Sequence, residues 1–420
     1  MGATITEKIL AKHAGRESVS PGELLNVDID LVLAHEVTTP PAISELEKLG
    51  IDRVFDSERI VVTPDHFVPN KDEKSADLAK RLRDWVKRHN IKHYYEVGRH
   101  GICHTMLIEQ GHIGPGMIVV AGDSHTCTHG VMGAFGWGVG STELAAAIAT
   151  GKLWLEVPET IKVVVEGKLP KGVYSKDVIL YVLSQIGVSG ATDKVLEFAG
   201  STIDELEVED RATITNMAVE AGATVGIINP DQKVFDYLSK RTNKKFDPVS
   251  SDPDAEYSQV HYFEVSSLEP LVGVPPLPSN GKPVGELKGV KIDQAVVGSC
   301  TNGRIQDLRE AAKILKGRKV APFVRMIVIP ATTSIWKQAL KEGLFDIFTE
   351  AGAAVSTPTC GPCLGAHMGV LAAGEVAIAS TNRNFVGRMG SPKSSVYIAS
   401  PATVAASAVR GEITDPREFL

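Results

Sequence analysis

The sequence lacks the features that mark membrane, exported and nucleic-acid-binding proteins. None of its apolar runs approaches the roughly 18 residues that span a bilayer, and the first residues, Met-Gly-Ala-Thr-Ile-Thr-Glu-Lys, contain no apolar core of a signal peptide. Lysine and arginine form no run that could follow a phosphate backbone, and the net charge is −7. We therefore expect a cytoplasmic protein with no membrane partner and no nucleic acid as its main partner.

Cysteine is also scarce. The chain has five cysteines, an odd number without an export signal, which argues against a disulfide framework and for a reducing compartment. Hydrophobic residues make up 43% and charged residues 23% of the 420 residues, close to the averages of globular proteins. This length suits two or three domains with a well-buried core.

Alternating strand and helix patterns fill the first expected domain, residues 1–160. Buried strands are predicted at 60–64 and 117–121, and amphipathic helices at 72–88 and 141–154. Ser141 is the predicted N-cap of the last helix. This alternation predicts an α/β fold with mostly parallel sheets.

Two further α/β domains are expected, at 161–285 and 286–420. The second contains a strand at 161–167 and three helices, near 175–186, 211–221 and 230–239. It ends in the proline- and glycine-rich stretch 272–283, whose composition favours an extended connector over a regular element. The third contains strands that end at Cys300, Pro330, Pro358, Ser380 and Ser400. Functional residues of open α/β sheets lie just after such strand ends.

The glycine-rich stretch 133–141 leads into a predicted helix and could be mistaken for a phosphate-binding loop. It lacks the lysine of a Walker motif and the spacing of the dinucleotide fingerprint. Tight packing and turning of the backbone is at least as good an explanation.

Three thiols follow two of the predicted strands, in Gly298-Ser-Cys300-Thr-Asn and in Cys360-Gly-Pro-Cys363. Three soft thiolate ligands suit a zinc ion or an iron–sulfur cluster with one metal position left free. Cys360 and Cys363 alone have the spacing of a dithiol redox pair, which stays an alternative.

Acidic residues stand beside histidines at several strand ends. These groups are His35-Glu36, Asp65-His66, Cys103-His104 and Asp123-Ser-His125-Thr-Cys-Thr-His129. A carboxylate beside an imidazole fixes its tautomer and makes it a proton donor or acceptor near neutral pH. Each pair alone is also explained by an ordinary hydrogen-bonded histidine, but the repeated placement favours acid–base catalysis.

The loop Asn382-Arg383-Asn-Phe-Val-Gly-Arg388 presents two guanidinium groups. Arginine binds carboxylates in bidentate fashion, so this loop suits a substrate with two or more carboxylates, although a structural ion-pair network would also explain it. A metal centre with a free position, proton-transfer pairs and an anion-binding loop together indicate reversible loss and addition of water on a small di- or tricarboxylate.

Four of these motifs resemble signatures of the aconitase superfamily, in the family's order across nearly the whole chain: Asp123-Ser-His-Thr, Gly298-Ser-Cys-Thr-Asn, Cys360-Gly-Pro-Cys-Leu-Gly and Asn382-Arg-Asn-Phe-x-Gly-Arg. The resemblance implies three α/β domains around a central site. It also implies one [4Fe–4S] cluster per chain, held by Cys300, Cys360 and Cys363, with one open iron.

The same resemblance implies roles for the polar residues. Asp65 and His66 match the family's proton-donating pair, and Asp123 and His125 match the residues around the open iron and its water. Glu220 matches a glutamate that partners the histidine corresponding to His104. The residues implied in hydrogen bonding near the cluster or in substrate binding are His35, Ser124, Asn216, Asn382, Arg383 and Arg388, with His35 at a position where aconitases proper have a different polar residue.

Single-chain aconitases carry a further swivelling domain with a substrate-binding arginine and the serine that removes the carbon-bound proton. This sequence ends at Leu420 without one, so the resemblance implies a large subunit that needs a small subunit carrying that domain. Families divided in this way are the isopropylmalate dehydratases, the methanogen-type homoaconitases and the citramalate or dimethylmalate hydro-lyases. We expect the isopropylmalate dehydratases first and the homoaconitases second.

Two other classes of function stay open. An aconitase-like chain without its cluster can bind RNA, which the acidic charge disfavours and which salt-sensitive RNA binding would support. A dithiol redox protein would keep thiol exchange through Cys360 and Cys363 when Cys300 is replaced, whereas a cluster protein would lose iron.

Overall fold

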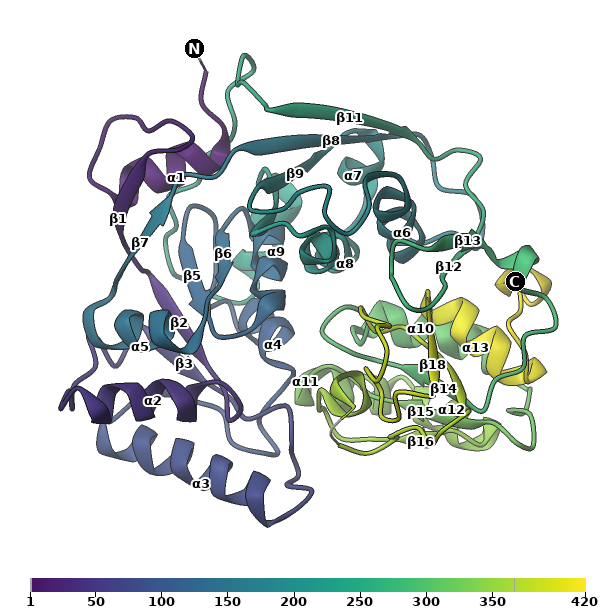
Figure 1. Ribbon diagram of the computed structural model, residues 1–420. Coiled ribbons are helices and arrows are strands. Elements are labelled where there is room, and N and C mark those ends of the chain that lie inside the picture. The colour runs from purple at the N-terminus through teal and green to yellow at the C-terminus, as the bar shows by residue number, and fades with distance from the viewer. Residues whose placement is uncertain (1, 366) are drawn as a thin grey trace.

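Three sheets of mostly parallel strands organise the chain in the computed structural model, which describes residues 2–365 and 367–420 (Figure 1). The predicted α/β class with mostly parallel sheets is confirmed. Within the described residues, no helix is long and apolar enough to cross a membrane.

The first sheet has the strand order β4-β3-β2-β5-β6, and all of its neighbours are parallel. The elements up to residue 156 are α1 (Ile5–His13), β1 (Leu24–Asp28), β2 (Leu31–Ala34), α2 (Thr39–Lys48), β3 (Ile60–Val62), α3 (Glu73–Arg88), β4 (His93–Tyr94), α4 (Cys103–Glu109), β5 (Ile118–Ala121), the 3-10 segment η1 (Ser124–Met132), β6 (Phe135–Gly138), α5 (Ser141–Thr150) and β7 (Lys152–Glu156).

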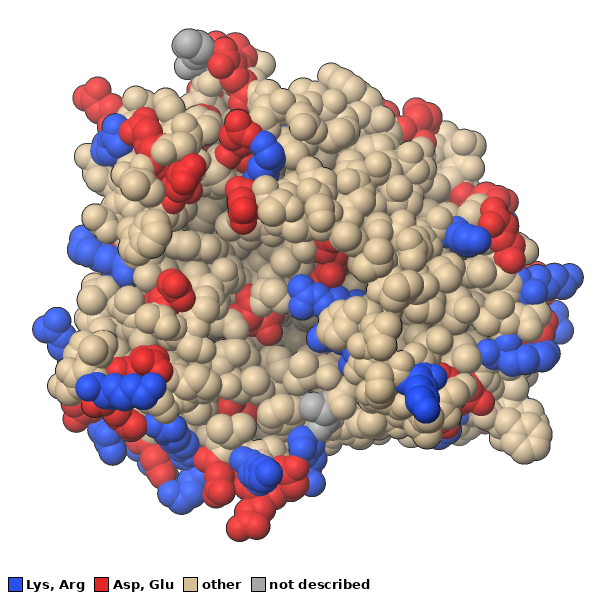
Figure 2. Space-filling view, in the orientation of Figure 1, with Lys and Arg blue, Asp and Glu red and all other residues tan. Residues whose placement is uncertain are grey.

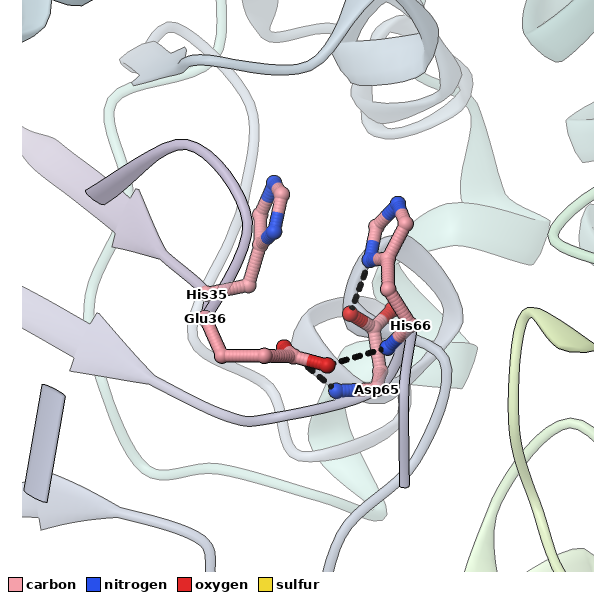
Figure 3. Close-up of side chains that lie close together, drawn as sticks. All are labelled: His35, Glu36, Asp65 and His66. Carbon is pink, nitrogen blue, oxygen red and sulfur yellow. Dashed lines mark hydrogen bonds and ion pairs between the residues drawn. The ribbon is translucent and has the colours of Figure 1, made fainter. Parts of the chain in front are cut away.

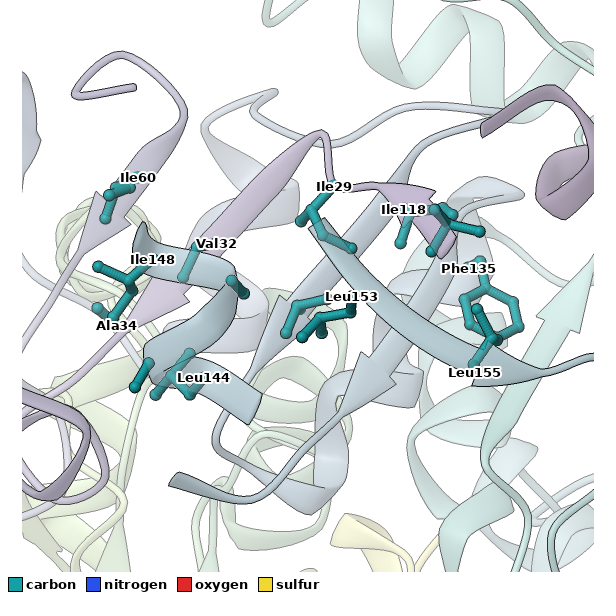
Figure 4. Close-up of a cluster of buried hydrophobic side chains, with 14 of the residues drawn as sticks. Ile29, Val32, Ala34, Ile60, Ile118, Phe135, Leu144, Ile148, Leu153 and Leu155 are labelled. Atoms are coloured by element: carbon teal, nitrogen blue, oxygen red, sulfur yellow. The ribbon is translucent and has the colours of Figure 1, made fainter. Parts of the chain in front are cut away.

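Apolar side chains from these elements form the core of the first sheet. Figure 4 shows Leu144 and Ile148 of α5 and Leu153 and Leu155 of β7 over the strands that carry residues such as Val32. Burying a branched aliphatic side chain of this size stabilises the fold by about 1.5–3 kcal/mol. The predicted helix at 72–88 is found as α3, where Asp72 accepts a hydrogen bond from the Ser75 backbone N–H and caps the first turn.

The helix predicted at 141–154 is too long. α5 ends at Thr150, because Gly151 adopts a left-handed conformation (φ 68°) that stops the helix. Residues 152–156 then form β7, which pairs antiparallel with β1. Ser141 is not the N-cap either, since Gly140 occupies that position.

The second sheet is also parallel throughout, with the order β10-β9-β8-β11. Its elements are β8 (Thr160–Glu166), α6 (Ser175–Ile186), β9 (Val195–Ala199), α7 (Ser201–Glu205), α8 (Val208–Asn216), η2 (Met217–Ala221), β10 (Val225–Ile228), α9 (Gln232–Ser239) and β11 (Gln259–Glu264). The helix predicted at 175–186 is confirmed, and the one predicted at 211–221 is divided between α8 and η2.

The third sheet has the order β13-β12-β18-β17-β14-β15-β16. Its elements are β12 (Leu271–Gly273), β13 (Gly281–Pro283), η3 (Val284–Leu287), β14 (Gln294–Val297), α10 (Ile305–Leu315), β15 (Arg325–Val328), α11 (Thr333–Lys341), α12 (Leu344–Ala351), β16 (Ala354–Val355), η4 (Gly361–Leu364), β17 (Val376–Ala379), β18 (Ser395–Ala399), α13 (Pro401–Arg410) and η5 (Pro416–Glu418).

The stretch 272–283 is not the irregular connector that its composition predicts. Residues at its two ends form β12 and β13, an antiparallel pair, and β12 also pairs antiparallel with β18. The prolines are tolerated because the pair is short and β13 lies at the edge of the sheet. The hairpin therefore joins the third sheet.

Candidate active site

The chain changes direction in the middle of two sheets. From β2 it runs to β3 on one side and later to β5 on the other, and from β14 it runs to β15 and later to β17 on the opposite side. At such a point the loops that follow the two central strands diverge and leave a crevice. The first crevice is flanked by His35 and Asp123, and the second by Cys300 and Asn382.

The residues of both crevices line one cavity of about 230 Å³. Figure 2 shows a hollow near the middle of this face, with acidic and basic side chains close to its rim. The predicted site residues that line the cavity are His35, Asp65, His66, His104, Asp123, Ser124, His125, Cys300, Cys360, Cys363, Asn382, Arg383 and Arg388. A larger cavity, of about 670 Å³ beside Trp137 and Trp154, contains none of them.

Backbone contacts between the first and third sheets hold the cavity together. The N–H of Ile102, just before α4, donates to Ala331 O at 2.7 Å. The ring of His100 is hydrogen-bonded through Nε2 to Pro358 O at 2.7 Å, and the N–H of Cys360 donates to Asp65 O at 2.7 Å. The cysteine loop and the acid–base residues are thus held by direct hydrogen bonds.

The three predicted ligand cysteines are free thiols at this cavity. Asn216 Nδ2 and Asn382 Nδ2 donate to Sγ of Cys300 at 3.3 and 3.2 Å. Arg388 Nη2 lies 3.6 Å from Sγ of Cys363. Burial raises the pKa of Cys300 to about 12. A hydrogen bond from Cys360 and the charge of Arg388 hold the pKa of Cys363 well below its usual value.

A zinc ion and an iron–sulfur cluster hold three thiolate ligands at different spacings. A single zinc ion, with Zn–S bonds of about 2.3 Å, holds its sulfurs about 3.8 Å apart. Among the described residues, the side chains whose ligand atoms all lie within 4.8 Å of one another do not include the three cysteines. Two buried thiols and the half-buried thiol of Cys360, which do not meet this spacing and have amide and guanidinium donors beside them, fit an iron–sulfur cluster better than a zinc ion.

Asp65 and His66 form a buried pair at the end of β3 (Figure 3). His66 Nδ1 donates to Asp65 Oδ1 at 2.6 Å, and Asp65 Oδ2 accepts the N–H of Cys103 at 2.7 Å. Burial raises the pKa of Asp65, but the charge and hydrogen bond of His66 outweigh it and leave the pKa at about 2. Burial lowers the pKa of His66, whereas Asp65 and Asp123 raise it well above its usual value.

His35, Glu36, Asp65 and His66 are the described side chains whose ligand atoms do come within 4.8 Å of one another. Glu36, however, is turned toward the backbone and accepts the N–H groups of Asp65 and His66 at 3.0 and 2.8 Å (Figure 3). It also accepts the N–H of Phe67 at 2.7 Å. Its carboxylate is therefore occupied in shaping the loop after β3, and the group is a poor metal site. Sequence reasoning noted Glu36 only as a neighbour of His35.

His35 stacks on His66, with ring centroids 4.4 Å apart and planes 13° apart. Burial and the neighbouring His66 lower the pKa of His35 to about 4, so the His35 ring is neutral at neutral pH. Nε2 is hydrogen-bonded to Thr38 Oγ1 at 3.0 Å.

Asp123 joins three histidines. Its Oδ1 accepts His104 Nε2 at 3.0 Å and the N–H of His125 at 2.8 Å, and its Oδ2 lies 3.6 Å from His66 Nε2. Although burial raises the pKa of Asp123, these histidines bring it well below its usual value. His129, which sequence reasoning quoted in the motif but did not select, lies 3.3 Å from His104 Nδ1 through Nε2.

Glu220 partners a different histidine from the one that the resemblance implies. Its Oε1 accepts His125 Nε2 at 3.0 Å, whereas His104 contacts Asp123 and His129. The reason is that η2 brings Glu220 against η1, where His125 lies. Arg383 Nε also donates to Glu220, at 2.8 and 3.1 Å, and its Nη1 donates to Ser124 Oγ at 2.9 Å.

Comparison with known proteins finds relatives of this chain over almost its whole length. The model of the aconitase family (aconitate hydratase) matches residues 7–411. Relatives named 3-isopropylmalate dehydratase large subunit include one from Heliobacterium modesticaldum, 57% identical over 418 residues with 100% of both chains covered, and one from Aquifex aeolicus, 57% identical over 425 residues with 100% of this chain and 98% of the relative covered.

The solved structures include Thermococcus kodakaraensis aconitase X in its holo form, with a TM-score of 0.48 and 12% identity over 85% of this chain and 84% of that one. The family match and the full-length relatives confirm the predicted resemblance, and this chain belongs to the aconitase family.

Proposed function

We propose that the chain is the large subunit of a 3-isopropylmalate dehydratase, a hydro-lyase that interconverts 2-isopropylmalate and 3-isopropylmalate by dehydration and rehydration in leucine biosynthesis. The observation that carries the proposal is the single cavity in which the three thiols, the Asp65–His66 pair and two arginines meet. Full-length relatives with that name support the choice of substrate. We place the enzyme in the cytoplasm.

Cys300, Cys360 and Cys363 would hold a [4Fe–4S] cluster in this enzyme. When bound, the cluster supplies a Lewis-acidic iron with an open coordination position. Asn216 and Asn382 donate to Cys300, and the guanidinium of Arg388 lies beside Cys363, so the protein provides the hydrogen bonds and positive charge that thiolate ligands require.

His66 is the proposed donor of the proton that leaves with the hydroxyl. Its Nδ1 is held by Asp65, which leaves Nε2 on the side of Asp123 to give the proton. The two carboxylates favour the imidazolium, and the neutral His35 ring stacked on it fixes its plane. His104, His125 and Glu220 would orient the polar groups of the site through Asp123 and Arg383.

Arg383, Arg388, Ser124 and His35 are the proposed substrate-binding residues. They approach the cavity from two sheets, and the two guanidinium groups suit a substrate with two carboxylates. Both carboxylates that line the cavity, Asp65 and Asp123, are already paired with histidines.

A base that removes the carbon-bound proton is therefore proposed to come from a small subunit with the swivel domain. The name of the relatives, large subunit, supports a hetero-oligomer. The resemblance assigns the base to a serine of that domain.

The test is an anaerobic assay of the reconstituted chain mixed with a candidate small subunit, in which absorbance reports the unsaturated diacid formed from isopropylmalate. We expect activity only when both subunits are present. Homocitrate is assayed in parallel, because homoaconitase is the second candidate. Activity on homocitrate alone would overturn the proposed substrate and keep the reaction type.

A further inference from the structure

Lys176 has no part in the site described above, yet it contacts the turn that carries part of it. It lies at the start of α6, and its side chain is fully buried. Nζ donates to the carbonyl oxygens of Ser380 at 3.1 Å and Thr381 at 2.7 Å, and it lies 3.4 Å from Sδ of Met217. All three of these partners are uncharged, so none of them neutralises the ammonium.

The turn after β17 links Lys176 to the thiols. Thr381 is followed by Asn382, whose Nδ2 donates to Sγ of Cys300 at 3.2 Å. Ser380 Oγ accepts the N–H of Gly298 at 3.0 Å, just before the Cys300 loop. Lys176 therefore holds a turn that connects α6 to the environment of Cys300.

Nearby carboxylates are occupied by other groups. Asp177 accepts the N–H groups of Tyr174 and Leu271, each at 2.8 Å. Asp307 accepts the N–H of Arg304 at 2.9 Å and Nδ2 of Asn302 at 2.8 Å. A buried cation is tolerated where nearby negative charge offsets its desolvation.

Two of the ligand cysteines add to the negative charge that acts on Lys176. Burial lowers the pKa of Lys176 to about 7, and the charges of Asp307, Cys300 and Cys363 act in the opposite direction. The geometry agrees, because Lys176 holds Thr381, and the next residue, Asn382, donates to Sγ of Cys300 at 3.2 Å. An ammonium in a dry interior stabilises thiolates more strongly than one at the surface.

We propose that Lys176 is a positioning residue that holds Asn382 against Cys300 and adds positive charge near the thiolate of Cys300. It touches no substrate. The inference rests on the cluster assignment in the proposed function, because three thiolates and a cluster would concentrate negative charge beside this ammonium. Removing the cation is expected to disfavour the reduced, more negative cluster most.

The test compares Lys176→Met, which removes the charge at similar length, with Lys176→Arg, which keeps it. After anaerobic reconstitution, the midpoint potential of the cluster and the rate of iron loss to a chelator are measured in the full chain. We expect a more negative potential and about tenfold faster iron loss in Lys176→Met, with values near wild type in Lys176→Arg. If Lys176→Met fails to fold, Lys176→Gln replaces it, and we expect the same change in potential and in iron loss.

Arg211→Met is the matched control. Arg211 is equally buried and donates to the carbonyls of Ile203 and Asp204, but its charged partner is Asp231. We expect a lower unfolding temperature and an unchanged cluster potential. A wild-type potential and iron retention in Lys176→Met, or an equal shift in Arg211→Met, would overturn the role of Lys176. Failure of the wild-type chain to take up iron would instead overturn the cluster assignment.

Discussion

At the scale of single residues, the chemistry of the site depends on histidines whose charge is set by their partners. Asp65 and Asp123 favour the charged ring of His66, whereas burial and His66 itself keep His35 neutral. Of the two stacked rings, His66 is the charged one and can donate a proton, and His35 is a neutral ring with a fixed position.

Asp65→Asn should lower the rate of dehydration by about 10²–10⁴-fold, because an amide no longer holds His66 in its charged form. Cysteine positions should be retained, since Cys360 bonds to the backbone carbonyl of residue 65. Turnover and iron content of the reconstituted enzyme are measured together. Asp30→Asn, which changes a half-buried aspartate paired with a histidine outside the cavity, should keep its activity. Full activity of Asp65→Asn would contradict the role given to this pair.

His13 offers a pH-dependent test of stability away from the site. Nε2 contacts Asp30 Oδ2 at 2.6 Å and Nδ1 contacts Ile9 O at 2.7 Å. Burial lowers the pKa of His13, but Asp30 outweighs it and raises the pKa above its usual 6.5. Because the pKa of His13 is higher in the folded than in the unfolded protein, the protonated ring stabilises the fold fully below pH 6.5. This stabilisation is lost as the pH rises through the pKa of the folded state.

His13→Gln should therefore lower the free energy of unfolding by about 1–2 kcal/mol at pH 6 and by less at pH 9. Urea unfolding at the two pH values measures the difference. Asp30→Asn, which removes the carboxylate that raises the pKa of His13, is the control and should reduce the same pH dependence. If the loss of stability in His13→Gln grew with pH, the raised pKa of His13 would be contradicted.

A site residue could be predicted from the sequence where it belongs to a short motif. The cysteines, Asp65-His66, Asp123-Ser-His125 and the arginine loop each lie in a short motif, and the structure brings them to one cavity. Glu36 and His129 stand in such groups, but their roles, like that of Lys176, depend on partners far along the chain and could not be predicted. The partner of Glu220 was predicted wrongly for the same reason.

At the scale of elements, the functional residues follow the ends of strands. Close packing against glycines of β6 shapes one of the loops that carry them. β6 lies against η1, and a Cβ at Gly138 would stand 2.5 Å from Asp123 O. The glycine-rich stretch 133–141 thus serves tight packing, one of the two explanations left open by its sequence.

Gly138→Ala should displace the backbone at Asp123 and Ser124, because the neighbouring atoms belong to the main chain and cannot move aside freely. We expect a loss of about 1–3 kcal/mol in stability and a clear loss of turnover. Gly285→Ala is the matched control, since a Cβ there meets nothing within 4 Å. Unfolding temperature and turnover are measured for both variants. Equal behaviour of the two would contradict the packing argument.

Element types were more predictable than element limits. The helix at 175–186 follows a clear periodicity, whereas the helix predicted at 141–154 extends into β7 because apolar residues continue past Gly151. The hairpin β12–β13 was missed because its partner strand, β18, lies more than 100 residues later in the chain. Amino-acid composition indicates local conformational preference but not the pairing of strands that are distant in the sequence.

At the scale of the whole molecule, two sheets face each other through the crevices at their switch points. His35 and Asp123 flank one crevice, and Cys300 and Asn382 flank the other, so proton-transfer groups and thiols share one cavity. A dithiol redox protein would need only Cys360 and Cys363. The contribution of both sheets to one site is better explained by a cluster enzyme that acts on a carboxylate substrate.

The most direct measurement is the iron and sulfide content of the chain after anaerobic reconstitution, compared with Cys300→Ser, Cys360→Ser and Cys363→Ser. We expect about four iron and four sulfide per wild-type chain and a marked loss in each variant. One zinc per chain, no bound iron, or unchanged iron content in Cys300→Ser would contradict it.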